Sequence, residues 1–463
     1  MNKYDLVVIG SGPGGYVAAI RSAQRGLKTA LIEKEHIGGV CLNWGCIPTK
    51  AIIKSVNTFR DIQTAASLGI ELGEAKADVK KIVARSRQVA DQLSKGISFL
   101  LKKNKVDIYD GFGKLLDANT IQVEKNDGEV ICIETADVIL ATGAKPKALP
   151  HIQPDGKKIL TSKHALALDE LPEKMAIMGA GAIGLEFAYI YKHLGVELTI
   201  IEALDAIAPN EDAEISKELL KQYKKQKIKS LVSTKVMKVE DNGDGLKLIL
   251  EGPKGESELE VDMLLSAVGV TPNTQGLGLE ELGIEMDGQF IKVNDKQETN
   301  VKHVYAIGDV AGNPCLAHKA SKEGLIAIDN IQAKSVEALK KDAIPACTYC
   351  EPQVASIGLS EEVAVERGLD YHISKVFYRA IGKAIAVGHV DGFMKFVVEK
   401  ESGKILGAHC IGAEATELIA ELSLAVTKGM TVKDVAETIH AHPTLSEITM
   451  ETAENALGEA IHV

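Results

Sequence analysis

Cys41 and Cys46 stand with four residues between them, and the sequence predicts that a helix starts directly after them. A helix N-terminus favours a thiolate because its N–H groups carry partial positive charge, so a cysteine there is a good nucleophile and a good leaving group. The pair is therefore typical of a disulfide that opens and closes during a reaction. A buried structural pair and half of a metal site are the alternatives. Metal sites usually have the tighter Cys-x2-Cys spacing and need two more ligands, and no second cysteine cluster lies nearby.

Two glycine-rich segments, residues 10–15 (GSGPGG) and 179–184 (GAGAIG), repeat one pattern. Each follows an apolar strand and precedes a helix, and an acidic residue lies at the end of the next strand. That residue is Glu33 in the first copy and Glu202 in the second, 23 positions after the first glycine in both (10 to 33 and 179 to 202). Each copy is thus predicted to form a strand, a glycine turn, a helix and a strand.

This pattern predicts dinucleotide binding. The first glycine permits a tight turn, the second lets the backbone approach a pyrophosphate, and the third allows close helix packing, while the carboxylate accepts hydrogen bonds from ribose hydroxyls. An ordinary strand–turn–helix is the alternative for either copy, but two copies in the same context argue against it. A carboxylate at Glu202 repels a 2′-phosphate, so NAD is favoured over NADP.

The composition is that of a globular protein with sizeable cores, since 45% of the 463 residues are hydrophobic and 25% are charged. The net charge of −11 argues against nucleic acid or a membrane surface as a partner. No apolar run approaches the length of a membrane span. A strand-like segment begins at Tyr4, which leaves no room for a targeting peptide, so we expect a cytoplasmic protein. Seven cysteines in a reducing compartment imply mostly free thiols, and any disulfide there is expected to be catalytic.

The elements that must position these residues follow a clear order. An α/β fold with two Rossmann-like dinucleotide-binding domains is expected, over residues 1–148 and 149–271, with a long amphipathic helix inserted in the first at about 78–105. A central segment, 272–342, is expected to return to the first domain. From 343 to 463 the pattern changes to strands followed by helices, which predicts a C-terminal α+β domain.

At this point the chain resembles a known family, the flavin-dependent pyridine nucleotide–disulfide oxidoreductases, and within it the branch that oxidises dihydrolipoamide. The resemblance covers essentially the whole chain. It is carried by both glycine segments, by residues 38–50, by Ala141-Thr142-Gly143, and by the segments 304–309, 316–319 and 440–447. It implies FAD in the first domain, NAD in the second, and a homodimer formed through residues 343–463 with active sites shared between the subunits.

The resemblance also implies roles for single residues. Cys41 resembles the thiol that exchanges with substrate, and Cys46 the thiol that packs against the flavin. Lys50 resembles the residue near the flavin that pairs with Glu186, although a solvated lysine on a helix is the ordinary alternative.

In the C-terminal domain, His442 resembles the catalytic base, and Glu447 is expected to bond its other ring nitrogen and so fix the tautomer. His440 is expected to have a packing or surface role.

The remaining expected contacts are with the two cofactors. For FAD they are Gly10, Gly12, Gly15, Glu33, Lys50, Gly113, Thr142, Gly143, Asp309 and Ala317, and for NAD they are Gly179, Gly181, Gly184, Glu202, Val236 and Gly269. Asp309 has a helix N-cap as its alternative role.

The expected activity is oxidation of dihydrolipoamide, with hydride transfer to NAD. The expected partners are lipoyl groups of 2-oxo-acid dehydrogenase or glycine cleavage components, with no metal, nucleic acid or membrane involved. A reductase of glutathione-like disulfides is the nearest rival, but such enzymes prefer NADPH and carry basic residues where Glu202 lies. Mercuric reductase is disfavoured because the chain ends without a cysteine pair, and a soluble transhydrogenase because it does not need both cysteines. A role mainly as a binding subunit of a 2-oxo-acid dehydrogenase complex is the alternative from a different class.

Two features do not fit the pattern. Trp44, the only tryptophan, lies between the two cysteines, where the family has small aliphatic residues; we expect simple packing, with contact to the disulfide or flavin as the alternative. Cys347-Thr-Tyr-Cys350 has no partner cysteine or histidine in sequence, so structural thiols are favoured over a redox or zinc site.

Overall fold

The computed structural model describes residues 2–335 and 337–463, which divide into two compact units. The first unit comprises residues 1–52, 78–147 and 269–339, and the second comprises 53–77, 148–268 and 340–463. Helix α3 (Cys46–Thr64) begins in the first unit and ends in the second.

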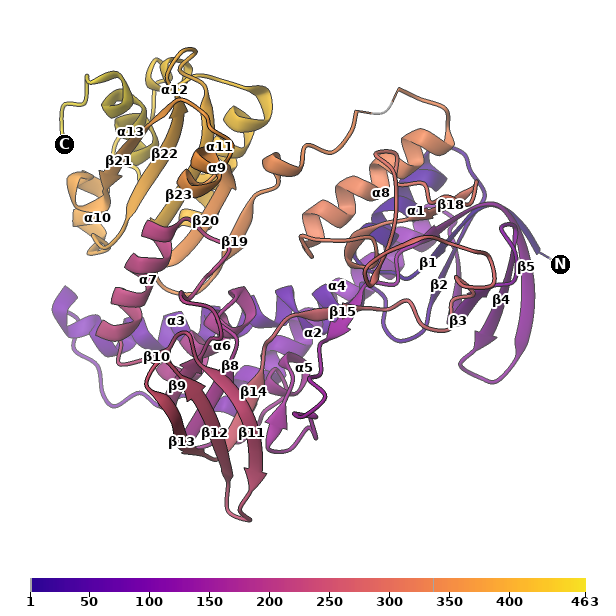
Figure 1. The fold of residues 1–463 in the computed structure, drawn as a ribbon, viewed down its shortest axis with the longest axis horizontal. Coiled ribbons are helices and arrows are strands. Elements are labelled where there is room, and N and C mark those ends of the chain that lie inside the picture. The colour runs from indigo at the N-terminus through magenta and orange to yellow at the C-terminus, as the bar shows by residue number, and fades with distance from the viewer. Residues whose placement is uncertain (1, 336) are drawn as a thin grey trace. The chain divides into compact units, whose positions relative to one another are not determined.

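The first unit is built on a mixed sheet, in which β1 lies between β2 and β5 and runs parallel to both, whereas β4 runs antiparallel to β3 and β5 (Figure 1). Val7 on β1 lies opposite Ala30 on one side and Val138 on the other. The strand is buried on both sides because Leu6, Val7, Val8 and Ile9 form a continuous apolar run. The strands are β1 (Asn2–Ile9), β2 (Thr29–Glu33), β3 (Asp107–Leu115), β4 (Thr120–Lys125), β5 (Val130–Leu140) and β18 (Val304–Ala306), with the short pairs β6 (Ala144–Pro146) and β15 (Val270–Pro272), and β16 (Met286–Asp287) and β17 (Phe290–Ile291).

The helices of this unit pack closely at small residues. The missing side chain of Gly14 lets α1 approach α8, since an added Cβ would lie 2.9 Å from the Ala320 carbonyl oxygen. The long helix α4 is capped by Asp78, whose side chain accepts the Lys81 N–H at 3.1 Å, and it lies where an amphipathic helix was expected, over about 78–105. The helices are α1 (Pro13–Gln24), α2 (Gly39–Trp44), α4 (Val79–Lys103), the 3-10 turn η2 (Gly308–Val310) and α8 (Ala317–Ile331).

The second unit repeats the strand arrangement of the first. Its central strand β8 has β9 on one side and β14 on the other, all parallel, just as β1 lies between β2 and β5. The elements are α5 (Ser162–Ala165), α6 (Ala182–His193), α7 (Ala213–Lys225) and the 3-10 turn η1 (Ala65–Leu68), with strands β7 (Ile159–Leu160), β8 (Lys174–Met178), β9 (Glu197–Ile201), β10 (Lys229–Leu231), β11 (Lys235–Asp241), β12 (Leu246–Gly252), β13 (Gly255–Val261) and β14 (Met263–Ser266).

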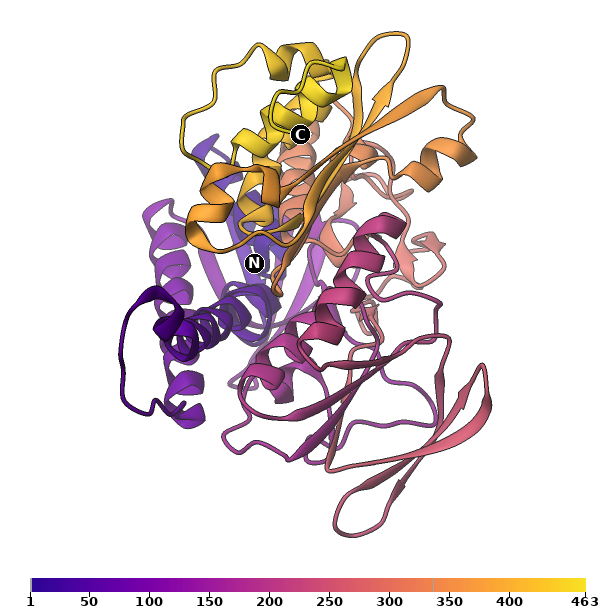
Figure 2. The same cartoon turned by 90° about the vertical axis from the view of Figure 1, so that its left-hand side faces the viewer.

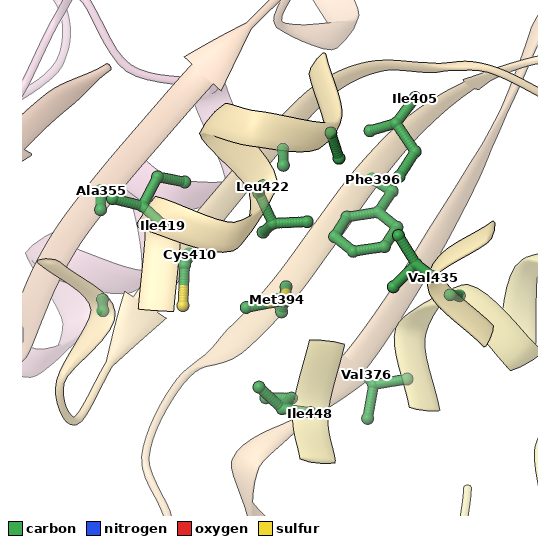
Figure 3. Packing of buried hydrophobic residues seen from close by; sticks show 14 of the residues in the cluster. Ala355, Val376, Met394, Phe396, Ile405, Cys410, Ile419, Leu422, Val435 and Ile448 are labelled. Carbon is green, nitrogen blue, oxygen red and sulfur yellow. The ribbon is translucent and has the colours of Figure 1, made fainter. Parts of the chain in front are cut away.

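The C-terminal part of the second unit is an antiparallel sheet covered by helices (Figure 2). One face of the sheet packs against α11 and α13, and Figure 3 shows Phe396, Met394 and Leu422 in that core. The elements are β19 (Ala346–Thr348), β20 (Gln353–Gly358), β21 (Tyr371–Phe377), β22 (Phe393–Glu399), β23 (Ile405–Gly412), α9 (Glu361–Glu366), α10 (Gly382–Val387), α11 (Ala415–Lys428), α12 (Val432–Ala436), α13 (Glu447–Leu457) and the 3-10 turns η3 (Lys341–Ala343) and η4 (Tyr378–Ala380).

The fold class is confirmed, because two Rossmann-like units, with the parallel strands β1, β2 and β5 in one and β8, β9 and β14 in the other, precede a C-terminal α+β region. The four domain segments expected from the sequence stay a prediction. Among residues 2–335 and 337–463, no helix combines the length and apolar character needed to cross a membrane.

Candidate active site

The two cysteines of the redox segment lie on successive helices. Cys41 is in the short helix α2, which the sequence did not indicate, and Cys46 is the first residue of α3, where a helix start was expected. Gly45 separates the helices. The segment packs against the first glycine turn, since a Cβ on Gly39 would lie 2.7 Å from the Gly12 Cα. The structure thus brings the cysteine pair and the first dinucleotide fingerprint together.

The two thiols interact directly. The Cys41 side chain hydrogen-bonds with that of Cys46, and this bond is the main reason that the pKa of Cys41 is raised above its ordinary value. Burial and the charge of Cys46 raise it further, whereas the Lys50 ammonium, one turn along α3, acts to lower it. Burial and the charge of Cys41 also raise the pKa of Tyr16 on α1, so this tyrosine lies near the pair. Cys46 occupies the N-terminus of α3, the helix start expected from the sequence, whereas Cys41 lies within the short helix α2.

The first glycine turn is shaped by close contacts. Gly10 has φ +102°, and a Cβ on it would meet the Ala141 carbonyl oxygen at 2.3 Å. A Cβ on Gly15 would lie 1.9 Å from the Gly10 carbonyl oxygen. A Cβ on Gly12, by contrast, would meet nothing within 4 Å among the described residues. This open space lies at the N-terminus of α1, where backbone N–H groups can receive a diphosphate.

The second glycine turn has the same geometry. A Cβ on Gly179 would lie 2.5 Å from the Ala267 carbonyl oxygen, and one on Gly184 would lie 2.0 Å from the Gly179 carbonyl oxygen. A Cβ on Gly181 would again find nothing within 4 Å among the residues that the structure describes. Both turns therefore leave room for a ligand at the second glycine and fill the space at the first and third.

The two acidic residues hold their turns in the same way. The Glu33 carboxylate accepts the Ser11 N–H at 2.9 Å and the Ser11 hydroxyl at 2.6 Å. The Glu202 carboxylate accepts the N–H groups of Ala180 at 2.7 Å and Leu204 at 2.9 Å. Each carboxylate oxygen has more than one acceptor site, so these bonds fix the carboxylate and leave it able to accept ribose hydroxyls.

The other residues expected at FAD lie on the same unit as the first turn. Thr142 exchanges two hydrogen bonds with Asn273, at 2.8 and 2.9 Å, next to Gly143 with φ +67°. Gly113 packs against the side chains of Ile9 and Ile32.

A buried ion pair that sequence reasoning missed holds the segment with Asp309. Lys319 and Glu323 form an i,i+4 pair at 2.9 Å on α8, which begins at Ala317. Glu323 accepts the Gly308 N–H at 2.7 Å, and Lys319 donates to the Gly312 carbonyl at 2.9 Å. The network fixes the turn that carries Asp309, and burial raises the pKa of that carboxyl.

On the second unit, Glu186 lies on α6 and is 5% exposed. It accepts the N–H of Tyr349 at 3.1 Å, so the segment Cys347–Cys350 is packed against this carboxylate. Burial raises the pKa of the Cys350 thiol to about 12, which suits a structural thiol rather than a nucleophile. Within residues 2–335 and 337–463, no group of three or more His, Cys, Asp or Glu side chains is placed to hold a metal ion.

Of the two other residues expected at NAD, Val236 belongs to the second unit and Gly269 to the first. Val236 is a buried residue of β11, and its carbonyl lies 3.3 Å from His151 Nε2. Gly269 follows the end of β14 with φ +103°. Neither position tests the expected cofactor contact.

The histidine and its carboxylate lie together as expected. His442 Nδ1 is 2.9 Å from Glu447, which also accepts the Thr444 N–H at 2.6 Å. Burial acts to raise the pKa of Glu447, but these two bonds outweigh it and lower that pKa below its ordinary value. The His442 side chain is 77% exposed, so its Nε2 is accessible.

His440 differs from His442 in every respect that bears on catalysis. Its side chain is 5% exposed, and both ring nitrogens are engaged, with the Thr438 carbonyl at 2.8 Å and Glu421 at 3.0 Å. The structure therefore supports the packing role expected from the sequence. Lys50 and Glu186 belong to different compact units, and their pairing stays a prediction.

Comparison with known proteins decides the family. A family model described as pyridine nucleotide-disulphide oxidoreductase matches residues 4–324, and a model for the dimerisation domain of that family matches 344–453. The chain belongs to the pyridine nucleotide-disulphide oxidoreductases. It is therefore an oxidoreductase whose cofactors are FAD and NAD, and its C-terminal region is a dimerisation domain.

Members of this family align with the chain over its length. A dihydrolipoyl dehydrogenase of Zymomonas mobilis is 45% identical and covers 100% of this chain and 99% of its own. One from Bacillus subtilis is 40% identical, with 99% of each chain covered. The crystal structure of LpdA from Mycobacterium tuberculosis superposes with a TM-score of 0.92 at 29% identity, covering 98% of this chain and 99% of that one.

Proposed function

We propose that this protein oxidises dihydrolipoyl groups and reduces NAD, using a Cys41–Cys46 disulfide and FAD. The main support is that the two thiols contact each other and that their segment packs against the first glycine turn. The carboxylate-held His442 supplies the proton handling that thiol exchange needs. The name dihydrolipoyl dehydrogenase, carried by the full-length relatives, agrees with this chemistry.

The residues of both turns fit the cofactors assigned to them. The open space at Gly12 and Gly181 is what a diphosphate approaching the backbone requires, and each helix start beyond it has no side-chain cap. FAD is proposed to be held by the first turn, with Glu33 on its ribose, and NAD by the second, with Glu202. Bound there, FAD would supply a two-electron carrier between the reduced cysteine pair and NAD.

His442 is proposed as the base. Glu447 holds Nδ1, and this fixes the tautomer in which Nε2 carries a lone pair. Nε2 takes the proton from one thiol of the substrate, and the carboxylate stabilises the imidazolium that results.

Thiol exchange then moves the electrons into the protein. The substrate thiolate attacks the Cys41 sulfur, the Cys41–Cys46 bond breaks, and Cys46 leaves as a thiolate. The second substrate thiol then attacks the substrate sulfur that is joined to Cys41, and its proton passes to the Cys41 sulfur. The substrate disulfide forms and Cys41 is released as a thiol. One disulfide has been reduced and one dithiol oxidised, so two electrons and two protons have left the substrate.

Glu202 is proposed to select NAD. Its side chain is 8% exposed and its two oxygens are held by Ala180 and Leu204, so it cannot swing away from an added phosphate without breaking both bonds. A 2′-phosphate would meet a fixed negative charge there.

We further propose a homodimer in which the partner supplies His442 to each cysteine pair, acting on lipoyl groups of 2-oxo-acid dehydrogenase or glycine cleavage components in the cytoplasm. The dimerisation-domain match supports this assembly. The exposure of His442 supports it too, because the ring is available to a group outside its own unit.

The test compares two substrate pairs on the purified holoenzyme. Lipoamide with NADH is expected to give a kcat/KM at least about a hundredfold above that for glutathione disulfide with NADPH, since both the thiol site and Glu202 discriminate. Equal rates, or a preference for glutathione disulfide, would replace the proposal by a low-molecular-weight disulfide reductase. Absence of activity with both pairs in an FAD-loaded dimer would favour a binding subunit.

A further inference from the structure

Trp44, the residue of the redox segment that the proposed chemistry does not use, is covered by an arginine. The guanidinium carbon of Arg87, on α4, lies 4.4 Å from the centre of the Trp44 ring. Arg87 Nη1 also donates a hydrogen bond to the Asn43 carbonyl at 2.5 Å. The Arg87 side chain therefore contacts the last two residues of α2, the helix that carries Cys41.

Asn43 connects this grip to the rest of the loop. Its amide nitrogen donates to the carbonyls of Ile37 at 3.1 Å and Gly39 at 2.9 Å, which are the residues before and at the start of α2. Its side-chain oxygen accepts the Ser94 hydroxyl of α4 at 3.1 Å. Two side chains of α4 thus fix α2 at its C-terminal end, and Asn43 transmits this to its N-terminal end.

The helix that carries Cys46 is held by the same α4. Arg85 Nη1 donates to the Ala51 carbonyl of α3 at 2.8 Å. Residues two apart on a helix do not share a face, so Arg85 and Arg87 can reach different helices. Both helices flanking Gly45 are therefore anchored to one rigid element.

The buried position of Arg87 is energetically unfavourable for its guanidinium group. Nε and Nη2 are buried and have no hydrogen-bond partner among residues 2–335 and 337–463, and burial lowers the pKa of the guanidinium, partly offset by Asp91. Buried donors without partners are uncommon in folded proteins. A planar cation stacked on an indole is the compensating contact.

We propose that Arg87 is a positioning residue for the redox pair, which holds the Trp44 end of α2 so that the Cys41 and Cys46 sulfurs stay within bonding reach of each other. This rests on the proposed redox role of the pair. Holding two reacting groups in place raises the effective concentration of one at the other, and here that favours the closed disulfide. Loss of the Arg87 contacts should make the disulfide easier to reduce.

The test is a redox titration of the FAD-loaded protein in mixtures of reduced and oxidised dithiothreitol, in which two electrons and two protons pass from the dithiol to the disulfide. Alkylation and mass spectrometry report the state of the cysteine pair. Arg87→Ala is expected to shift the equilibrium about tenfold toward the dithiol, which is about 30 mV. Lys95→Ala, which removes a positive charge from an exposed position of the same helix, should leave it unchanged.

The single tryptophan gives an independent reading. Trp44 fluorescence reports α2 alone, because the chain has no other tryptophan. Its emission should change on Arg87→Ala and not on Lys95→Ala. If Arg87→Ala does not fold, the same titration is carried out on Arg87→Lys, which keeps the charge but loses the planar guanidinium. A shift of its thiol–disulfide equilibrium by about threefold or more supports the proposal.

Two outcomes are distinguishable. A wild-type protein whose Cys41 and Cys46 never form a reducible disulfide would overturn the proposed function itself. A normal wild-type titration with a folded Arg87 variant at the same equilibrium would overturn the positioning role alone.

Discussion

At the scale of single residues, the site separates groups that react from groups that hold them. His442 and His440 are two positions apart, yet one ring is exposed with an accessible Nε2 and the other is enclosed with both nitrogens engaged. The sequence could suggest which histidine matters only through the resemblance. The carboxylate partners, Glu447 and Glu421, show the physical difference, because both bind a histidine but only one leaves its far nitrogen accessible.

Substitution of the two histidines should have opposite effects on kcat and on stability. His442→Gln should lower kcat for dihydrolipoamide oxidation by about 10²- to 10⁴-fold, the range for loss of a general base. His440→Gln should keep kcat within about threefold while lowering the thermal midpoint, because the buried imidazole ring loses its bond to Glu421. Steady-state rates and thermal unfolding of the two variants check this. A His440 variant with the larger loss of kcat would reverse the assignment.

At the scale of elements, the two strand–turn–helix units show which parts of the structure a local sequence pattern can predict. The glycine turns could be predicted from the sequence because the first and third glycines of each turn lie against backbone that leaves no room for a side chain, either in the same turn or just after a neighbouring strand. The Lys319–Glu323 pair is also local, at i,i+4, but the same spacing occurs on ordinary helix surfaces and so carries little information. The Arg87 contact with Trp44 joins positions 43 apart, and no pattern in the sequence signals it.

Matched glycine substitutions test the assignment of the two turns. Gly15→Ala and Gly184→Ala each place a Cβ about 2 Å from a carbonyl oxygen of their own turn. Gly15→Ala should cost FAD occupancy, measured by flavin absorbance. Gly184→Ala should retain FAD and raise KM for NADH about tenfold or more.

The control is Gly96→Ala in α4, where the backbone is helical and a Cβ would meet no described residue within 4 Å. It should be neutral or stabilising by about 0.5–1 kcal/mol. Loss of FAD from the Gly184 variant with NADH binding intact would mean that the two turns have been assigned to the wrong cofactors.

At the scale of the whole molecule, a buried charge cluster joins the second dinucleotide fold to the dimerisation domain within one unit. Lys395 of β22 is fully buried and pairs with Asp212 at 3.0 Å, Glu214 at 2.9 Å and Glu361 at 2.6 Å. It points away from the core formed by Phe396, its neighbour, because successive strand residues face opposite sides. Its partners lie up to 183 positions away, so this junction could not be predicted from the sequence.

Lys395→Met should destabilise the protein by about 3–5 kcal/mol, because it leaves the fully buried Asp212 carboxylate without its lysine cation. The expected fall in thermal midpoint is on the order of 10 °C. Lys400→Met is the matched control: Lys400 pairs with Asp370 on the exposed edge of the same sheet, where an ion pair contributes at most about 1 kcal/mol.

The same cluster gives a pH dependence of known sign. Burial acts to raise the pKa of Asp212 and Glu214, but nearby cations, among them Lys395, lower both below their ordinary values of 3.8 and 4.5. Their contribution is therefore present above those values and is lost as pH falls through the lowered pKa. The thermal midpoint of Lys395→Met should therefore approach that of the wild-type protein as the pH is lowered. A difference between the two midpoints that grows on acidification would contradict the role of the cluster.

The most direct test of the whole account is the rate of dihydrolipoamide-dependent NAD reduction by Cys41→Ser, with Cys132→Ser on β5 as the control substitution. We expect Cys41→Ser to lower this rate at least about a thousandfold, while it keeps its FAD and still oxidises NADH with an artificial electron acceptor that takes electrons from the flavin. Cys132→Ser should keep a normal rate. A Cys41→Ser protein that reduces NAD at a near-normal rate would contradict the redox disulfide on which the account rests.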